Sequence, residues 1–266
     1  MDRRTEGSAG QRLLDLANVG KTFSNGVTAL AGVDLALSEG EFLSLLGPSG
    51  CGKSTALRLI AGLSTPTTGR LEWAGAAARG VLEVGFVFQE PTLMPWASVF
   101  DNVWLPLRLR GRSRQEAGPA VEAMLERVHL SGFAASMPRE LSGGMKMRVS
   151  IARALVTQPR ILLMDEPFAA LDEITRFKLN EDLLKLWQDQ RFTVAFVTHS
   201  VFESVFLSSR IVVMAARPGR VHSEIAIGAR YPRGDAFRTS PEYAALCRHV
   251  SGALAEAMDA SREAAP

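Results

Sequence analysis

The sequence is poor in cysteine, with only two in 266 residues. Cys51 and Cys247 lie far apart, and Cys51 falls in a glycine-rich segment where a disulfide would obstruct access to the backbone. This pattern predicts a chain that resides in a reducing compartment.

The sequence also lacks long apolar runs. No segment reaches the ~18 consecutive apolar residues of a membrane-spanning helix. The first seven residues, Met1–Gly7, are polar and lack the apolar stretch of a secretory signal. We therefore expect a soluble chain, whose role at a membrane would come through a partner.

A large excess of charge of either sign is missing as well. Thirty Lys and Arg oppose 28 Asp and Glu, which gives a formal net charge of +2. No block of like charges resembles a basic arm or an acidic tail, so we expect no nucleic-acid partner. The apolar fraction of 47% is sufficient for the core of one large domain, or of one domain with an inserted subdomain.

Apolar runs alternate with helical patterns along most of the chain. After a leader at residues 1–11 that we expect to be disordered, Leu13–Val19 and Val27–Leu37 are predicted to pair as antiparallel strands. Residues 41–46 form a strand that enters a glycine-rich turn and a helix at Lys53–Leu63. Further strands are predicted at Val84–Phe88, Ile161–Met164, Thr193–Thr198 and Arg210–Met214. The alternation indicates an α/β core with a mostly parallel sheet and flanking helices.

Strand signals are absent between about 91 and 157. Helical periodicity at Arg114–Val128 and Gly143–Val156 predicts a mostly helical inserted subdomain there. The main domain is placed at 12–225, and residues 226–266, which are too few for a second folded domain, are expected to form a C-terminal appendage.

A phosphate-binding motif lies between the strand at 41–46 and the following helix. It matches G-x-x-x-x-G-K-[ST], in which backbone N–H groups and a helix N-terminus hold phosphates. We expect Lys53 to reach the β- and γ-phosphates of a nucleotide and Ser54 to ligate Mg²⁺. The candidate nucleotide-binding residues are Gly47, Pro48, Ser49, Gly50, Cys51, Gly52, Lys53, Ser54 and Thr55.

Two carboxylates end the strand at Ile161–Met164. Asp165 can hold the Mg²⁺ shell, and Glu166 is placed to polarise a water that attacks the γ-phosphate. An acidic strand end is often only a loop boundary, so this prediction depends on the phosphate motif. The catalytic candidates from these two motifs are Glu166 and Lys53.

Ser142, Gly143 and Gly144 begin a predicted helix, where backbone N–H groups and a hydroxyl can meet a second anion. A plain N-cap would use the same serine without any ligand. With the earlier motifs, and in the same order, Leu141-Ser142-Gly143-Gly144-Met145 resembles the signature of the ABC ATPase family. Met145 stands where that family usually has glutamine, so a contact from a glutamine side chain is not carried over.

Four further residues resemble functional positions of this family. The resemblance implies that Gln89 senses Mg²⁺ or water, that Asp172 approaches the nucleotide, and that His199 contacts the γ-phosphate as a catalytic residue. Phe23 resembles the aromatic that stacks on adenine, although it equally fits a core strand. Taken singly, such a Gln or Asp is usually a surface residue, and such a His is usually structural.

The family resemblance also implies a fold and an assembly. ABC ATPases have a P-loop NTPase core, an N-terminal antiparallel β subdomain and an inserted helical subdomain. The signature of one subunit closes over the nucleotide of the other, so we expect a second copy of this chain, with ATP and Mg²⁺ as cofactors. The histidines at 129, 222 and 249 have no metal-ligand spacing, and we expect metal only with the nucleotide.

A closer likeness covers roughly residues 12–225. The segments Val87–Trp96, with its Pro95-Trp96, and Thr198–Glu203 are similar to importers of the nitrate, sulfonate and taurine group. This implies membrane permease subunits, a solute-binding protein and a position at the cytoplasmic face of the cell inner membrane. The apolar side chains expected either to receive a permease helix or to pack the lobe's own core are Leu93, Met94, Trp96 and Val99.

Two other functions remain open at this point. A soluble P-loop kinase or nucleotide switch would use Lys53 and Asp165 but would not need the segment 142–144. The ATPase of an exporter would have the same motifs and differ only in its partner.

Overall fold

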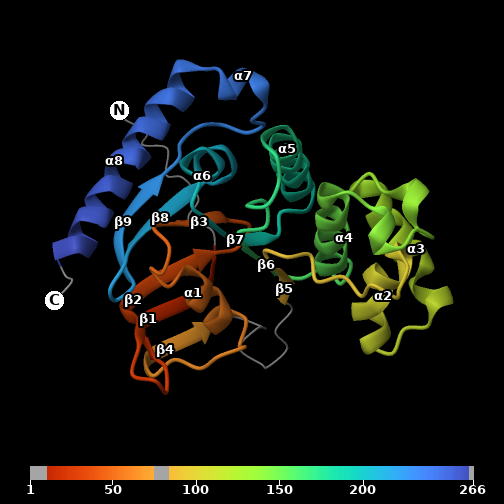
Figure 1. Ribbon diagram of the computed structural model, residues 1–266, viewed down its shortest axis with the longest axis horizontal. Coiled ribbons are helices and arrows are strands. Elements are labelled where there is room, and N and C mark those ends of the chain that lie inside the picture. The colour runs from red at the N-terminus through yellow and green to blue at the C-terminus, as the bar shows by residue number, and fades with distance from the viewer. Residues whose placement is uncertain (1–10, 75–83, 264–266) are drawn as a thin grey trace, which may run out of the picture.

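Two sheets enclose one helix in the computed structural model, which describes residues 11–74 and 84–263 (Figure 1). The smaller sheet is antiparallel, in the order β2-β1-β4. Its strands are β1 (Arg12–Thr22), β2 (Thr28–Ser38) and β4 (Thr68–Trp73). The β1–β2 turn passes through Gly26 at a φ of 84°, a conformation that glycine adopts without steric cost. The antiparallel opening predicted from the sequence is confirmed.

The larger sheet has the strand order β5-β6-β7-β3-β8-β9 and is parallel except for β9. Its strands are β3 (Phe42–Leu46), β5 (Val84–Val87), β6 (Ile161–Asp165), β7 (Thr193–Thr198), β8 (Arg210–Ala215) and β9 (Arg220–Ala226). The parallel strands at its centre have near-continuous apolar sequences because both of their faces are covered. Every parallel strand predicted from the sequence is present.

The two faces of this sheet bury different halves of the molecule. Leu43 and Leu45 of β3 point toward α1 (Lys53–Ile60) and the smaller sheet. Phe42 points to the other face, where its ring meets that of Trp187 edge-on at 5.7 Å. Helices on that face are α5 (Glu173–Gln190), α6 (Val201–Leu207), α7 (Asp235–Arg238) and α8 (Pro241–Glu263).

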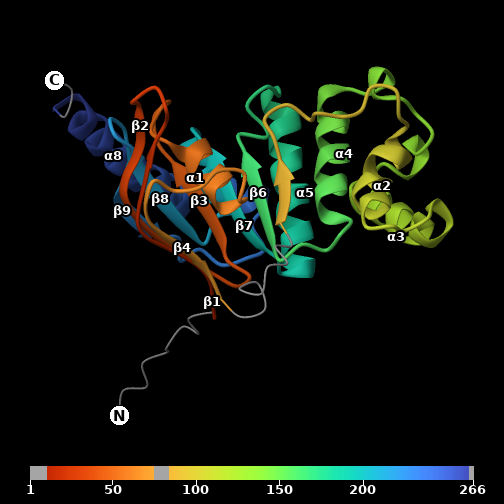
Figure 2. The same ribbon diagram turned by 90° about the horizontal axis from the view of Figure 1, so that it is seen from below.

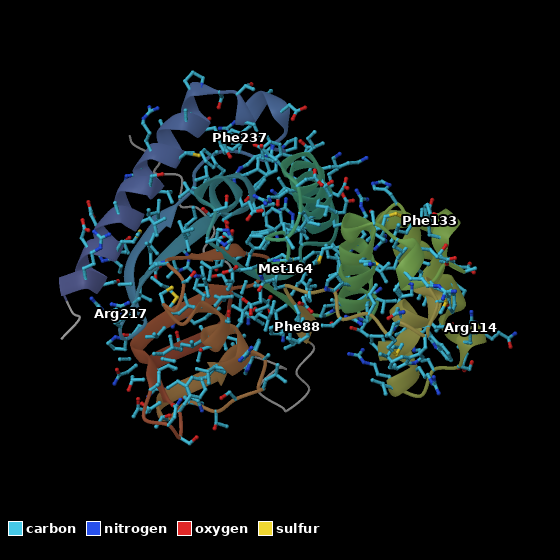
Figure 3. All side chains as sticks on the ribbon, viewed as in Figure 1. Phe88, Arg114, Phe133, Met164, Arg217 and Phe237 are labelled. Carbon is cyan, nitrogen blue, oxygen red and sulfur yellow. The ribbon has the colours of Figure 1, made fainter. Side chains whose placement is uncertain are left out.

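A helical lobe lies at the opposite end of the molecule from α8 (Figure 2). It contains α2 (Val99–Leu109), α3 (Arg114–Arg127) and α4 (Gly143–Leu155), with short 3-10 turns at Ser131–Phe133 and Pro138–Glu140. Ser113 and Glu116 form a capping box that starts α3. Arg114 and Phe133 lie on this lobe, whereas Met164 lies in the central sheet (Figure 3). The predicted inserted helices are therefore present, and α4 joins the lobe to the core through β5 and α5.

The apolar side chains expected on the lobe surface divide into two groups. Trp96 is 77% exposed, but Val99 is fully buried beside Phe100 and Val103. Of the two alternatives expected for these side chains, Val99 takes the second and packs in the lobe's own core, on the inward face of α2.

The chain after β9 runs back over the core, where α8 packs along α6, β8 and β9 (Figure 1). Arg233 holds this C-terminal segment against the core. Its side chain is buried, and its guanidinium donates hydrogen bonds to main-chain carbonyls of two separate segments. The acceptors are the carbonyl oxygens of Val205, Phe206, Ser208, Ile227 and Ala229.

None of the helices in residues 11–74 and 84–263 is both long enough and apolar enough to cross a membrane. The predicted disordered leader at 1–11 lies outside the described residues except for Gln11.

We expect Arg233→Met to destabilise the protein by at least about 3 kcal/mol, because it leaves several buried carbonyl groups without their donor. The free energy of unfolding from urea titration measures the effect. Arg230→Met is the matched control, since Arg230 is exposed. Equal unfolding free energies for the two variants would contradict this account of how the C-terminal segment is held.

Candidate nucleotide-binding site

The loop between β3 and α1 brings backbone N–H groups to one point. Gly50 and Gly52 adopt φ values of 79° and 88°, which L side chains rarely adopt. A Cβ at Gly47 would lie only 2.6 Å from the Met214 carbonyl oxygen, so only glycine fits there. Gly52 is also the N-cap of α1 and has no side chain to bond the first amides of the helix. These amides can therefore meet an anion.

The Lys53 side chain lies inside this loop. The residue is only 5% exposed, and its Nζ donates to the carbonyl oxygens of Gly47 and Pro48 at 2.8 and 3.0 Å. Its neighbour Cys51 is buried as well, and burial raises the pKa of that thiol above its ordinary value. The loop thus holds a compact positive charge at its centre, next to a neutral thiol.

Ser54 and Asp165 meet across the sheet edge. The Ser54 hydroxyl donates to Oδ1 of Asp165 at 2.8 Å. Burial raises the pKa of Asp165, while the hydrogen bond from Ser54 and the charges of Arg58 and Lys53 oppose that rise. A half-buried carboxylate beside a hydroxyl is an oxygen-donor set suited to Mg²⁺.

Glu166 and His199 form a second pair at the same edge. Glu166 has a φ of 47°, and its N–H donates to the Val197 carbonyl at 3.0 Å, which fixes the turn after β6 against β7. His199 follows β7, and its Nδ1 lies 3.3 Å from Oε2 of Glu166. A carboxylate and an imidazole are therefore paired beside the phosphate loop.

A cavity of about 390 Å³ collects most of these groups. Its walls are Val27, Thr28, Ala29, Ser49, Gly50, Gly52, Lys53, Ser54, Thr55, Glu166 and Arg217. Glu166 and six residues of the phosphate motif share this space, as the sequence predicts.

The sequence analysis did not predict that Arg217 and the strand start at Val27–Ala29 would line this cavity. The Pro-Gly dipeptide after Arg217 marks a turn between two strands, but nothing in it shows which loop the turn approaches. The approach depends on Gly219, where a Cβ would lie 2.3 Å from the Cys51 carbonyl oxygen. Backbone hydrogen bonds then join Gly219 to Ala29 and Ala31, which brings Arg217 to the cavity.

Phe23 and Gln89 do not line this cavity. Phe23 is 42% exposed in the turn after β1, with the Lys21 ammonium 5.5 Å from its ring centre. Gln89 is exposed just beyond β5, at the same sheet edge as Asp165.

The signature segment also lies outside the cavity. The Ser142 hydroxyl accepts the Met145 N–H at 3.3 Å as the N-cap of α4. Asp172 caps α5 in the same way by accepting the Thr175 N–H at 2.9 Å, and these hydrogen bonds lower the pKa of Asp172. A Cβ at Gly144 would lie 2.7 Å from the Thr175 methyl group, so the two capped helix starts pack directly together. Within one chain, these residues are separate from the phosphate loop.

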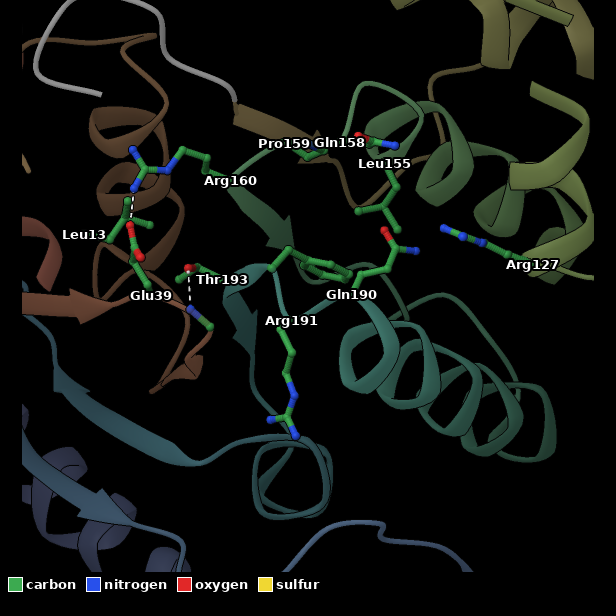
Figure 4. A pocket seen from close by; sticks show the side chains of 12 residues that line it. Leu13, Glu39, Arg127, Leu155, Gln158, Pro159, Arg160, Gln190, Arg191 and Thr193 are labelled. Carbon is green, nitrogen blue, oxygen red and sulfur yellow. Dashed lines mark hydrogen bonds and ion pairs between the residues drawn. The ribbon is translucent and has the colours of Figure 1, made fainter. Parts of the chain in front are cut away.

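A larger depression of about 480 Å³ lies at the other edge of the sheet, where the parallel strands begin (Figure 4). Its walls carry the ion pair of Arg160 with Glu39 and the side chain of Arg191. None of the predicted site residues lines it. Volume alone therefore does not identify the site, because the motif residues follow the carboxyl ends of the strands.

Comparison with known proteins identifies the family. The ABC transporter family model matches residues 30–169. An uncharacterised ABC transporter ATP-binding protein of Methanocaldococcus jannaschii is 47% identical over 234 residues, which is 86% of each chain. The aliphatic sulfonates import ATP-binding protein SsuB of Bacillus subtilis is 42% identical over 224 residues, 84% of this chain and 86% of that one.

Solved structures agree with this assignment. CbiO1 of Clostridium perfringens, described as part of an ABC transporter complex, matches with a TM-score of 0.74 and 27% identity over 82% of this chain and 89% of its own. A dimeric ATP-binding cassette in a post-hydrolysis state with ADP and Pi matches with a TM-score of 0.71 and 35% identity, covering 82% of this chain and 100% of that one. The α/β P-loop fold expected from the sequence is confirmed, and the chain belongs to the ABC transporter family as an ATP-binding, ATP-hydrolysing subunit.

Proposed function

We propose that this chain is the ATPase of an ABC importer and energises uptake of a small solute through membrane permease subunits. The pair of Glu166 and His199 beside the phosphate loop is the observation that carries the catalytic part. The importer part is supported by relatives such as SsuB, whose name states the import of aliphatic sulfonates.

The phosphate chain of ATP would enter the cavity between Lys53 and Arg217. The first amides of α1 hold its oxygens, and the Lys53 ammonium, which now bonds two loop carbonyls, turns to the β- and γ-phosphates. Arg217 adds a second positive charge to the residues that line the cavity.

Mg²⁺ fits the donors at the sheet edge. Ser54 and Asp165 offer adjacent oxygen ligands, and the charges of Lys53 and Arg58 act on the half-buried carboxylate. When bound, the ion neutralises charge on the phosphates. Gln89, at the same edge, is the further ligand that the family resemblance implies.

Glu166 is the proposed base. It accepts a proton from the attacking water while the new P–O bond forms at the γ-phosphorus and the bond to the β-phosphate oxygen breaks, which releases ADP. With an N–H at Nδ1, His199 would donate to this carboxylate and hold it in place. A contact from the other ring nitrogen to the γ-phosphate requires an N–H there as well, because the phosphate oxygens are acceptors.

A second copy of the chain would complete the site. The starts of α4 and α5 lie outside the cavity of their own chain, although they present Ser142, Gly143 and Asp172 together. We propose that they face the γ-phosphate held by the other copy. The matched cassette described as dimeric supports this arrangement.

The permease would dock on the lobe, around Trp96, which is 77% exposed, and the half-buried Leu93 and Met94. We place the complex at the cytoplasmic face of the inner membrane, with a solute-binding protein outside and a nitrate, sulfonate or taurine-like solute. An exporter ATPase would differ in its partner alone, and the named import relatives favour uptake.

We expect Glu166→Gln to lower ATP hydrolysis at least about 100-fold, because the neutral amide cannot accept the proton of the attacking water. Phosphate release measures turnover, and calorimetry should show ATP affinity within a factor of about two of the parent. Glu122→Gln, an exposed change on α3, is the control and should hydrolyse normally. A Glu166→Gln protein with parental turnover would eliminate Glu166 as the base.

Gly143→Asp tests the shared site without disturbing the fold. A Cβ at Gly143 meets only the Leu171 side chain at 3.5 Å, an ordinary contact. The added carboxylate would repel the γ-phosphate held by the other copy, so hydrolysis should fall at least about tenfold, equal to ~1.4 kcal/mol.

Size-exclusion chromatography in the Glu166→Gln background provides the second readout for Gly143→Asp. ATP should dimerise the Glu166→Gln protein but not the double variant. Gly132→Asp, at another open glycine on the lobe, is the control. Dimers that persist in the double variant would argue against the composite site.

We expect Trp96→Ala to weaken binding to the permease at least about tenfold, because large aromatic side chains dominate such interfaces. ATP binding by the isolated chain should not change. Co-purification with the permease measures the loss. Phe133→Ala, an exposed aromatic elsewhere on the lobe, is the control. Equal retention of both variants would place the docking surface elsewhere.

A further inference from the structure

Glu203 of α6 is a buried carboxylate that takes no part in the proposed reaction. The residue is only 7% exposed. Its helix lies beside α5 on the helical face of the large sheet (Figure 1). Burying a charged side chain costs free energy unless hydrogen bonds and an opposite charge compensate for the lost water. The partners of Glu203 therefore indicate what its burial achieves.

One partner of Glu203 is Thr198, the last residue of β7. The Thr198 hydroxyl donates to Oε2 of Glu203 at 2.5 Å. The same hydroxyl oxygen accepts the N–H of Ser200 at 2.9 Å. Because the carboxylate takes the hydroxyl proton, the oxygen lone pairs stay available to the Ser200 N–H. These two hydrogen bonds hold the turn that carries His199 between Thr198 and Ser200.

The His199 side chain itself is loosely held. It is 58% exposed, and Nδ1 lies 3.3 Å from Oε2 of Glu166. A side chain that is mostly exposed takes its position chiefly from its backbone and from the residues that support it. The hydrogen bond between Thr198 and Ser200 therefore sets the direction in which the imidazole leaves the chain.

The other partner of Glu203 is Arg176 of α5. Nε of Arg176 lies 3.8 Å from Oε1 of Glu203. The same Nε donates to the Phe168 carbonyl at 3.2 Å, and Nη2 donates to the Leu171 carbonyl at 2.8 Å. Both carbonyl groups belong to the loop that follows Glu166. Arg176 thus holds this loop while its positive charge faces the buried carboxylate.

The surroundings of Glu203 compensate in part for its burial. Burial raises the pKa of Glu203, and the Thr198 hydrogen bond and the charges of Arg176 and His199 oppose that rise. An apolar contact of the same size would often stabilise a fold as well as such a buried ion pair does. A polar junction differs from an apolar one because its hydrogen bonds have fixed directions. It is therefore suited to hold the two loops in one relative orientation.

We propose that Glu203 and Thr198 are positioning residues for ATP hydrolysis, because the carboxylate holds the Thr198 hydroxyl and this hydroxyl holds the turn that carries His199. Through Arg176 the same carboxylate is tied to the loop after Glu166, so the imidazole and the proposed base stay in contact. Neither positioning residue lines the phosphate-loop cavity. The proposal rests on the catalytic roles given to Glu166 and His199 in the proposed function.

Two substitutions of Thr198 separate its hydroxyl from its packing. Thr198→Val removes the hydroxyl at nearly constant volume, whereas Thr198→Ser keeps the hydroxyl and loses the methyl group. We expect Thr198→Val to lower kcat for ATP hydrolysis at least about tenfold, and Thr198→Ser to stay within a factor of about three of the parent. Calorimetry should show ATP affinity within about twofold of the parent for both variants. The reverse order of kcat would indicate a packing role and overturn the proposal.

Thr193→Val is the matched control for lost stability. Thr193 begins the same strand, is equally buried, and accepts the Gly40 N–H at 3.1 Å, at the opposite edge of the sheet from His199. This variant should hydrolyse ATP at the parental rate. Glu203→Gln keeps an acceptor for the Thr198 hydroxyl but loses the charge that faces Arg176, so its kcat should fall less than that of Thr198→Val.

A double variant tests whether Thr198 acts through His199. In the His199→Ala background, Thr198→Val should change kcat less than about twofold, because the residue that it positions is gone. Additive effects of the two substitutions, or a Thr198→Val protein with parental kcat, overturn the proposal and leave the proposed function standing. A His199→Ala protein with parental kcat would instead refute the catalytic role of His199 on which the proposal rests.

Discussion

The parallel register of β3, β7 and β6 is the constraint on which the candidate site depends. Leu46 lies opposite Thr198, and Val197 lies opposite Asp165, so the three strands end at one edge. The phosphate loop, the carboxylate pair and His199 all follow from those ends. The Ser54–Asp165 and Glu166–Val197 hydrogen bonds then hold three chain segments, far apart in sequence, together at this edge. A register shift of one residue would turn each of these side chains toward the opposite face.

The strands and the motif residues could be predicted from the sequence, because each depends on local information. A continuous apolar run indicates a buried strand, and the phosphate motif specifies its own loop conformation. The position of Arg217 could not be predicted in this way, since it depends on the close approach of Gly219 to Cys51. Val99 shows the same limit, because a helix start that is apolar can face either its own lobe or a partner. The surroundings of Asn180 could not be predicted either, since they come from α6 and from α7 and α8, which begin 55 or more residues later.

Two buried polar side chains of this protein, Arg233 and Asn180, differ in how fully they are hydrogen-bonded. Arg233 is surrounded by carbonyl acceptors, and its hydrogen bonds tie α6 to the segment after β9. Asn180 is equally buried and makes no hydrogen bond of normal geometry in the described residues, although it lies close enough to Glu203 to oppose the rise that burial causes in the pKa of that carboxyl. The first arrangement contributes to stability and the second opposes it. The C-terminal segment takes part in both, since the chain that Arg233 anchors continues directly into the helices that carry Arg238 and Tyr243.

Helix α5 runs from the signature segment to a cavity of about 390 Å³ that residues of α6 and α8 also line. Its first turn packs Thr175 against Gly144, and the next residue, Arg176, bonds the loop between Glu166 and Asp172. The next residue, Phe177, and Asn180, one turn further, line this cavity. A helix that contacts the signature segment at one end and this cavity along its side would move the cavity wall whenever the signature segment shifts.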